Sequence, residues 1–422
     1  MLASLVSSPW PTWAIAAAAT AGVILRPFAW PEYVWATVGA LLLVLLGLLP
    51  PTAALAGVAR GTDVYLFLLG MMLLAELARQ QGLFEWLAAH AARHARGSAT
   101  RLFTLVFGVG TLVTVFLSND ATAVVLTPAV AAVARAVKAE QPLPYLLACA
   151  FVANAASFVL PISNPANLVI YGSQMPPLLT WLPRYALPSL VAILATYAAL
   201  RFTQRVALRQ AVTTAIPLPR LSGGGRLAAG GIAGTAIVLL AASGFDLPLG
   251  LPTFLAGLAA AALVLRGSAS AALAVARGIA WGVLPLVAGL FVLVAALDRT
   301  GLTEALAGLL QALVRHSTTL SAGTAGGVLA LGTNLVNNLP AGLVAGRVVE
   351  VAQVPEPVRA AVLIGVDIGP NLSVTGSLAT ILWLLALRRE GVVVTAWAFL
   401  RLGAVVMPPA LLLALAAVAL AA

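Results

Sequence analysis

The chain has 422 residues, of which 62% are hydrophobic and only 9% are charged. A soluble domain averages about 25% charged residues, whereas many apolar runs here reach the roughly 20 residues needed to cross a bilayer. The short alternating segments of a membrane β-barrel are not found. The composition therefore predicts an all-α polytopic membrane protein and excludes an ordinary soluble domain.

The net charge is +10, from 23 Lys+Arg against 13 Asp+Glu. These basic residues lie in loops between apolar runs, so the positive-inside rule explains them better than a nucleic-acid partner does. Cys149 is the single cysteine, which excludes an internal disulfide and a multi-cysteine metal site. We expect no nucleic-acid partner, no cofactor and no bound metal.

The apolar segments in chain order predict ten spans, two of them broken. The start has neither a basic region nor an A-x-A-like cleavage pattern, so the first apolar segment is interpreted as a span. Spans are expected at 12–26, 32–49, 62–79, 143–171 (broken), 181–202, 227–244, 248–265, 279–297, 356–386 (broken) and 396–421.

Two further apolar regions, 100–138 and 318–352, each carry a polar centre. We expect re-entrant hairpins there, because non-helical backbone at membrane depth is tolerated only inside protein or beside a wet cavity. Residues 203–226 hold several arginines and Gly223-Gly-Gly225, which predicts a flexible cytoplasmic linker between repeats at 1–202 and 227–422. Five full crossings in each repeat would make the repeats inverted and place both termini outside.

Internal similarity supports this division. Gly82-Leu-Phe-Glu-Trp-Leu-Ala88 resembles Gly301-Leu-Thr-Glu-Ala-Leu-Ala307, and the same offset of 219 residues places Asn119 on Asn338. Beyond the hairpins the offset becomes 204, which places Asn167 on Asn371 and Ser163 on Asp367. Inverted repeats with discontinuous helices recur in secondary transporters, with the substrate near the midplane.

Four polar segments interrupt the apolar regions: Ser118-Asn-Asp120, Ser163-Asn-Pro-Ala-Asn167, Asn337-Asn338 and Asp367-Ile-Gly-Pro-Asn371. Their prolines break helices and free backbone groups for a ligand. One such segment would suit polar contacts between helices, but four related by a repeat predict a binding site. The candidate substrate-binding residues are Ser118, Asn119, Thr122, Asn154, Ser163, Asn164, Asn167, Asn337, Asn338, Asn371, Ser373 and Thr375. Ordinary interhelical hydrogen bonding is an alternative for Asn154.

Asp120 and Asp367 are the candidate proton-coupling residues. Apolar surroundings favour the protonated form of a carboxyl group, which suits a proton carrier. The alternative is a structural carboxylate bound to N–H groups at a helix end. Asp63 and Glu76 lie near the two ends of the third span, where interfacial anchoring is expected.

His90 and His94 have metal-ligand spacing, but they lie on a basic amphipathic segment, 82–96, without a third ligand. A solvated interfacial face explains them better. The sequence has no Walker A loop, no G-x-S-x-G and no H-E-x-x-H, so it gives no support for ATP hydrolysis or proteolysis. We predict that the protein is not an enzyme.

The polar segments carry a family resemblance that covers nearly the whole chain. Phe116-Leu-Ser-Asn-Asp-Ala-Thr-Ala-Val-Val-Leu-Thr-Pro128, Ile162-Ser-Asn-Pro-Ala-Asn-Leu168, Asn334-Leu-Val-Asn-Asn-Leu-Pro-Ala341 and the segment 365–383 resemble the arsenite efflux pump membrane protein family of the ion transporter superfamily. Some family members carry an acid where Asn154 stands, so the resemblance gives no titrating group there.

The resemblance implies export of arsenite and antimonite in exchange for protons, and hence arsenic resistance, by alternating access in the inner (plasma) membrane. It also implies that a soluble arsenite-activated ATPase can act as a partner, and that the asparagines at 119 and 338 occupy the hairpin tips. The main alternative is a sodium/proton antiporter of the same superfamily. A dicarboxylate carrier and an intramembrane enzyme are further alternatives, less favoured because the motifs lack an arginine partner and catalytic groups.

Overall fold

The computed structural model describes residues 8–213 and 219–421, and the regular elements of these residues are helices. Four of the described helices are long and apolar enough to cross a membrane alone. Two bent pairs, with kinks of 46° and 41°, also reach that length when each pair counts as one span. The predicted all-α polytopic class is therefore confirmed.

The first half of the chain is described up to residue 213. It contains α2 (Trp10–Leu25), α3 (Glu32–Leu45), α4 (Pro51–Arg60), α5 (Thr62–Gln80), α6 (Leu83–His94), α7 (Ala99–Phe116), α8 (Asn119–Ala121), the π-helical turn η2 (Thr122–Leu126), α9 (Thr127–Ala136), α10 (Leu143–Ala155), α11 (Pro165–Tyr171) and α12 (Leu178–Thr203), with 3-10 turns η1 (Pro27–Ala29), η3 (Pro161–Ser163), η4 (Gly172–Gln174) and η5 (Ala207–Arg209).

The second half has the same order of elements. It contains α13 (Gly223–Gly244), α14 (Gly250–Leu265), α15 (Ala269–Gly278), α16 (Val283–Asp298), α17 (Leu302–His316), α18 (Thr318–Val336), α19 (Asn338–Ala352), α20 (Glu356–Ile368), the 3-10 turn η6 (Gly369–Asn371), α21 (Leu378–Arg389) and α22 (Ala396–Ala421).

Most expected spans coincide with helices, and three differences have a local cause. The short helices α4, α6, α15 and α17 were not among the predicted spans, because each is amphipathic rather than apolar throughout. Helix α13 begins at Gly223, inside the predicted linker, where the Ser222 hydroxyl accepts a hydrogen bond from the Gly225 N–H at 2.9 Å. Helix α7 forms the first arm of a predicted hairpin and is also long enough to cross a membrane.

The two halves have the same helix caps and the same positive-φ glycines at positions 219 residues apart. Ser98 caps α7 and Ser317 caps α18, each through its hydroxyl. Gly82 and Gly301 precede α6 and α17 with φ of 73° and 78°, a conformation that favours glycine. Equivalent caps and turns at equivalent places support the repeat detected in the sequence.

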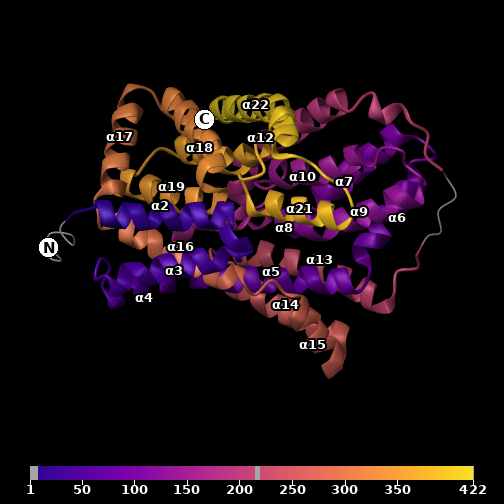
Figure 1. The fold of residues 1–422 in the computed structure, drawn as a ribbon, viewed down its shortest axis with the longest axis horizontal. Coiled ribbons are helices and arrows are strands. Elements are labelled where there is room, and N and C mark those ends of the chain that lie inside the picture. The colour runs from indigo at the N-terminus through magenta and orange to yellow at the C-terminus, as the bar shows by residue number, and fades with distance from the viewer. Residues whose placement is uncertain (1–7, 214–218, 422) are drawn as a thin grey trace.

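The ends of α5 and α16 show their relative direction. Arg60, just before α5 begins, lies 3.8 Å from the carboxylate of Asp298, where α16 ends. Figure 1 shows α5 leading from α4 at the left toward α6 at the right, and α16 leading from α15 toward α17 at the left, so these repeat-equivalent helices run in opposite directions, as an inverted repeat requires. The division at 202 and 226 stays a prediction.

The two halves contact each other through two helix pairs, each with one helix from either half: α5 packs along α14, and α16 packs along α3. The crossings are close because a glycine lies at each. A Cβ at Gly70 would lie 2.4 Å from the Thr253 carbonyl oxygen, and one at Gly289 would lie 2.8 Å from that of Ala36. These glycines are also 219 residues apart, so both contacts belong to the repeat.

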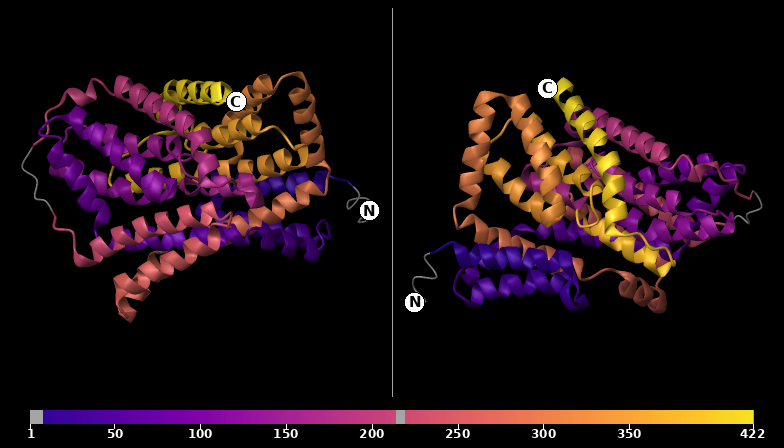
Figure 2. Two further views of the ribbon diagram at one scale, coloured as in Figure 1. Left: turned by 180° about the vertical axis from the view of Figure 1, so that it is seen from behind. Right: turned by 45° about the horizontal axis from the view of Figure 1, so that its top comes forward.

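Figures 1 and 2 show the resulting layers. Helices α3, α4, α5, α14 and α16 form one layer, and the hairpins, the broken helices, α12 and α22 form the other. The second arm of each broken helix packs on the hairpin of the other half: α11 on α19, and α21 on η2 and α9. We call the first layer the scaffold and the hairpins with the broken helices the transport unit.

One end of the molecule gathers loops that carry arginines. There the Arg135 guanidinium pairs with the Glu390 carboxylate, and the Val212 N–H donates to the Gly97 carbonyl at 3.3 Å. The loops after α6, α9, α12 and α21 thus share this end, and its cytoplasmic position stays a prediction of the positive-inside rule. The chain termini at 1–7 and 422, which were expected outside, lie beyond the described residues.

Candidate functional site

The two helix breaks contact each other at the centre of the transport unit. Asn164 caps α11, since its Oδ1 accepts from the Ala166 N–H at 3.1 Å. Its Nδ2 donates to Oδ1 of Asp367, in the last turn of α20, at 2.6 Å. Both side chains are buried. A capping asparagine of one half thus binds the carboxylate of the other.

A second bridge lies beside the first. Asn154 Nδ2 donates to Asn371 Oδ1 at 3.0 Å and to Thr380 Oγ1 at 3.4 Å. The Asn371 amide in turn donates to the Phe151 carbonyl at 3.1 Å. Asn154 therefore forms an interhelical hydrogen bond that joins α10 to the break after α20, and its role in substrate binding stays a prediction.

Two buried acceptors remain without a donor in this network. Asn167 Nδ2 donates to the Ser157 carbonyl at 2.9 Å, but its Oδ1 has no partner. The second carboxylate oxygen of Asp367, Oδ2, also has none. An unpaired buried acceptor costs about 1–3 kcal/mol, so a proton or the hydroxyls of a solute would satisfy both groups.

The tip of the first hairpin begins at Ser118, which caps α8 by accepting from the Ala121 N–H at 3.1 Å. Asn119 Oδ1 accepts from the Asp120 N–H at 2.9 Å, and Thr122 bonds Thr114 at 2.8 Å across the hairpin. The Asp120 carboxylate is half-buried and forms no hydrogen bond with the described residues. It is therefore free for a proton or a ligand.

The tip of the second hairpin has the equivalent cap. Asn337, with φ of 70°, accepts from the Leu339 N–H at 3.4 Å and donates to the Thr375 carbonyl at 3.2 Å. The Asn338 N–H donates to the Gly376 carbonyl at 2.8 Å. The Asn338 side-chain amide makes no hydrogen bond among the described residues, so it too is free.

The remaining candidates tie each break to the hairpin of its own half. Ser163 Oγ donates to the Val115 carbonyl at 3.1 Å. Thr375 Oγ1 donates to the Asn334 carbonyl at 2.8 Å, and Ser373 Oγ donates to Asn334 Oδ1 at 2.7 Å. Asn334 was not among the predicted site residues, although it opens the motif that contains Asn337 and Asn338. Its place at the start of that motif, three residues before Asn337, was a usable signal.

The electrostatic character of the site follows from these residues. Helices α8, α11, α19 and α21 all begin here, each capped by a serine or asparagine, and their N–H ends favour electron-rich groups. Among the described residues, the buried charged side chains are Glu76 and Asp367, with no buried lysine or arginine. The site therefore offers amides, hydroxyls and carboxyl groups, but no basic side chain to neutralise an anion.

The two other acids singled out in the sequence have structural roles. Asp63 Oδ1 accepts from the Gly250 N–H at 2.7 Å and so caps α14 from the neighbouring helix. Glu76 is 6% exposed and receives hydrogen bonds from Arg79 at 2.5 and 2.7 Å. Glu76 also packs against α15 at Gly278, and interfacial anchoring of the two acids stays a prediction.

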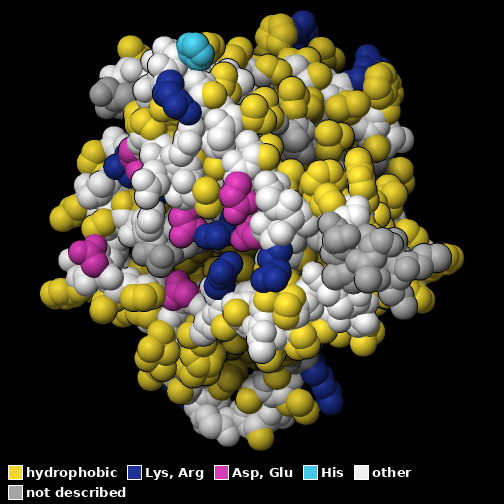
Figure 3. All heavy atoms as spheres, turned by 90° about the vertical axis from the view of Figure 1, so that its left-hand side faces the viewer, with side chains coloured by type: hydrophobic (Ala, Val, Ile, Leu, Met, Phe, Trp, Pro, Cys, Tyr) yellow, Lys and Arg dark blue, Asp and Glu magenta, His cyan; other side chains and the backbone are white. Residues whose placement is uncertain are grey.

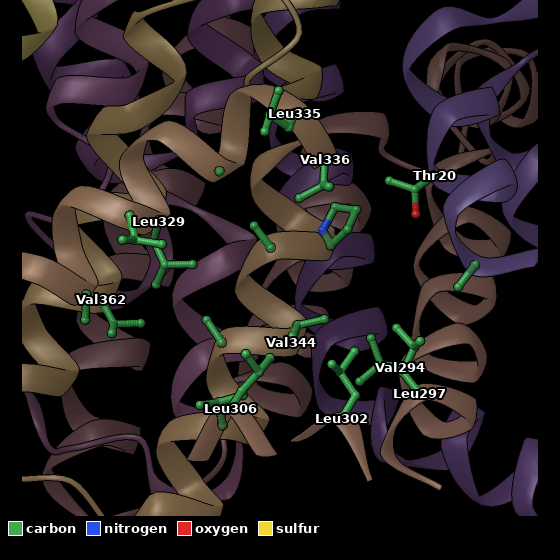
Figure 4. Close-up of a pocket in the computed structure, with 18 of the residues that line it drawn as sticks. Thr20, Val294, Leu297, Leu302, Leu306, Leu329, Leu335, Val336, Val344 and Val362 are labelled. Atoms are coloured by element: carbon green, nitrogen blue, oxygen red, sulfur yellow. The ribbon is translucent and has the colours of Figure 1, made fainter. Parts of the chain in front are cut away.

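A separate cavity of about 780 Å³ lies between α2 and α16 on one side and α18 and α19 on the other. Figure 4 shows Val294 and Leu297 opposite Val336 and Val344, all directed into it. Its hydroxyl groups come from Thr20 and Thr324 alone. A small polar solute would gain few hydrogen bonds there, so this crevice suits apolar chains and is not the candidate site.

Comparison with known proteins places the chain in a family. The family profile described as citrate transporter matches residues 16–366. The chain belongs to this family. Members of the citrate transporter family move solutes across membranes, so the protein is a multi-pass membrane transporter.

Individual proteins that are similar to this chain confirm the resemblance found in the motifs. The chain is 29% identical over 378 residues to the arsenical pump membrane protein of Escherichia coli K12, covering 83% of this chain and 85% of that protein. It is 29% identical over 383 residues to the protein of the same name from Yersinia enterocolitica, with the same coverage. An uncharacterised transporter of Mycobacterium tuberculosis H37Rv is 27% identical over 383 residues, covering 83% and 84%.

Two solved structures share the fold of this citrate transporter family member. The YdaH transporter of Alcanivorax borkumensis gives a TM-score of 0.56 at 16% identity and 87% coverage of both chains. MtrF of Neisseria gonorrhoeae, described as illuminating a class of antimetabolite efflux pumps, gives 0.53 at 17% identity, with 90% of this chain and 83% of that one covered. At these identities the likeness concerns the architecture.

Proposed function

We propose that this protein exports arsenite, and also antimonite, from the cytoplasm in exchange for protons and so confers arsenic resistance. The similarity to arsenical pump membrane proteins supports the substrate class. The observation that carries most weight is the buried site itself, which combines free amides and unpaired carboxyl oxygens without a basic side chain.

The site chemistry suits arsenite, which is mainly the neutral trihydroxide near neutral pH. Its hydroxyls can donate to acceptors such as Asn167 Oδ1 and Asp367 Oδ2, which lack partners. They can accept from the amides of Asn119 and Asn338, which have N–H groups to donate. Trivalent arsenic is trapped tightly by three thiolates, and the single cysteine, Cys149, cannot supply them. Contacts through oxygen and nitrogen permit the release that transport requires.

Citrate fits this site less well, despite the description of the family. A tricarboxylate needs basic side chains or metal ions at its binding site, because burying unpaired carboxylates is costly. The buried residues described here include Asp367 and Glu76, but no lysine or arginine. A neutral solute exchanged for a proton avoids that cost.

Proton coupling is assigned to Asp120 and Asp367. The Asp367 carboxylate is held by Asn164 through one oxygen and has the other free, so it can alternate between a bound proton and a bound solute. A proton shifts the balance of inward- and outward-facing states only if it binds them unequally. Movement of the transport unit against the scaffold changes the surroundings of both acids and can supply that difference.

The proposed location is the inner membrane, with the arginine-rich end in the cytoplasm. Proton exchange alone can drive export, so a soluble ATPase partner is not required for basal activity. A preparation of the purified protein without any ATPase should therefore transport.

Counterflow in proteoliposomes tests the substrate assignment. Vesicles loaded with unlabelled arsenite should take up radiolabelled arsenite transiently, and antimonite loading should support the same uptake. Loading with sodium chloride or citrate should not. Uptake that depends on loaded citrate, or no arsenite uptake above protein-free vesicles, would overturn the proposal, and sodium-dependent proton movement without arsenite counterflow would establish the antiporter alternative.

A further inference from the structure

A cavity of about 460 Å³ opens at the end of the molecule opposite the arginine-rich loops. It lies between scaffold helices α4, α5 and α16 and transport-unit elements α11, α19 and α20. Figure 3 shows this face, where basic and acidic side chains gather around a hollow. A volume of this size falls in the range of roughly 300–1,000 Å³ that is usual for small-molecule sites.

The lining is positively charged. Arg60 from α4, Arg347 from α19 and Arg359 from α20 all line the cavity, together with one acid, Glu350. Asp298 also pairs with Arg347, at 3.1 Å, and with Arg60, at 3.8 Å. Three arginines against two carboxylates leave one net positive charge, held by side chains from three separate helices.

Arg359 carries that unbalanced charge. Arg347 is doubly paired, to Asp298 and to Glu350, whereas no described carboxylate pairs with Arg359. Its Nε is buried and has no acceptor, and its guanidinium lies 5.5 Å from the centre of the Tyr171 ring. The guanidinium is half-buried beside a polar cavity, and one of its N–H groups has no hydrogen-bond acceptor. An anion bound in the cavity would supply that acceptor.

We propose that this cavity binds a small tetrahedral oxyanion of the phosphate type, held by Arg359 with Arg60 and Arg347. The planar guanidinium group matches two oxygens of such an anion, and the anion would supply the acceptor that Arg359 Nε lacks. The site is distinct from the buried amide network, although Leu168, next to Asn167, also lines the cavity. Because Arg60 belongs to the scaffold and the other two arginines to the transport unit, the bound anion joins the two bodies at the outer face.

The phosphate group can come from a free ion or from a lipid headgroup, and one set of variants distinguishes the two sources. The full chain, purified in an uncharged detergent, is heated with increasing inorganic phosphate at constant ionic strength. We expect a saturable rise in the unfolding temperature. Arg359→Gln should weaken the apparent affinity about tenfold or more, since a charge-assisted bidentate contact is lost.

Two further variants keep this test decisive. Arg315→Gln serves as the matched control, because Arg315 is an exposed arginine of α17 that does not line the cavity. Arg60→Gln removes a largely exposed arginine of the site and should weaken phosphate binding even if Arg359→Gln does not fold.

The lipid source is tested in nanodiscs of phosphatidylcholine with and without phosphatidylglycerol. Stabilisation by phosphatidylglycerol that depends on Arg359 and Arg60, without an effect of free phosphate, would assign the site to a headgroup. No stabilisation by either, or stabilisation that survives unchanged in both site variants, would overturn the proposal.

Discussion

Asn164 and Asp367 lie 203 residues apart in the chain and are joined by a hydrogen bond of 2.6 Å. Asn164 caps the helix that follows the first break, and Asp367 lies in the last turn of the helix that precedes the second. The proton state of Asp367 is thereby linked to the geometry of both breaks, because a neutral carboxyl group is a weaker acceptor than a carboxylate. This bond is where a proton could influence the arrangement of the whole transport unit.

The first prediction concerns the two carboxyl groups. Asp367→Asn and Asp120→Asn keep the size of the side chain but cannot bind the coupling proton. If the replaced acid carries the coupling proton, its variant should still exchange arsenite at equal pH. It should no longer accumulate arsenite when a pH difference is imposed. Equal-pH exchange is the internal control, since misfolding would abolish both activities. If the double variant retains full pH-driven accumulation, the assignment of these acids is wrong.

The second prediction separates the free amides from the bonded ones. Asn338→Ala removes an amide that has no side-chain partner, while the backbone bond from Asn338 to Gly376 is kept. The arsenite concentration at half-maximal rate should rise about tenfold, as expected for one lost hydrogen bond to the solute, with the thermal stability unchanged. A large fall in thermal stability with an unchanged arsenite response would contradict a direct contact.

Asn154→Ala is the matched comparison, because it breaks a bonded amide at similar depth. Asn371 Oδ1 would lose its donor, which should lower the free energy of unfolding by about 1–3 kcal/mol. Thermal unfolding in detergent measures this loss. An unchanged unfolding temperature would show that the bond to Asn371 contributes little.

The third prediction concerns Cys149, which is buried and donates to the Tyr145 carbonyl one helical turn before it, at 3.6 Å. Serine can donate to the same carbonyl, so Cys149→Ser should fold and should retain arsenite export, because one thiol cannot chelate arsenic. Transport measured at matched membrane abundance checks this. Loss of export at normal abundance would mean that the thiol takes part.

The fourth prediction concerns the crossing of α5 and α14. Gly70→Ala would place a methyl group 2.4 Å from the Thr253 carbonyl oxygen, so the two helices must separate. Overpacking of this kind typically costs about 1–3 kcal/mol. Gly108→Ala is the control, since a Cβ at that helical glycine meets no atom within 4 Å. Equal unfolding temperatures for the two variants would show that the close crossing is unimportant.

The sequence predicted the helical class, most spans and the four polar segments, because long apolar runs and proline-broken motifs are local signals. The similar segments that begin at Gly82 and Gly301, for example, indicate the repeat from the sequence alone, and the φ angles of the two glycines agree with it. The bond between Asn154 and Asn371 could not be predicted, since it depends on how two broken helices pack. The charged cavity at Arg359 could likewise not be predicted from the sequence, because its arginines come from separate helices and match no motif.

The most direct test of the central claim is pH-driven accumulation of arsenite. Purified protein in liposomes with an acidic lumen is placed in a more alkaline buffer that contains radiolabelled arsenite. Protons leaving the lumen should drive arsenite inward above its external concentration in either orientation of the transporter, and an ionophore that collapses the pH difference should abolish the accumulation. Arsenite that only equilibrates, at the level of protein-free liposomes with the same pH difference, would contradict arsenite/proton exchange.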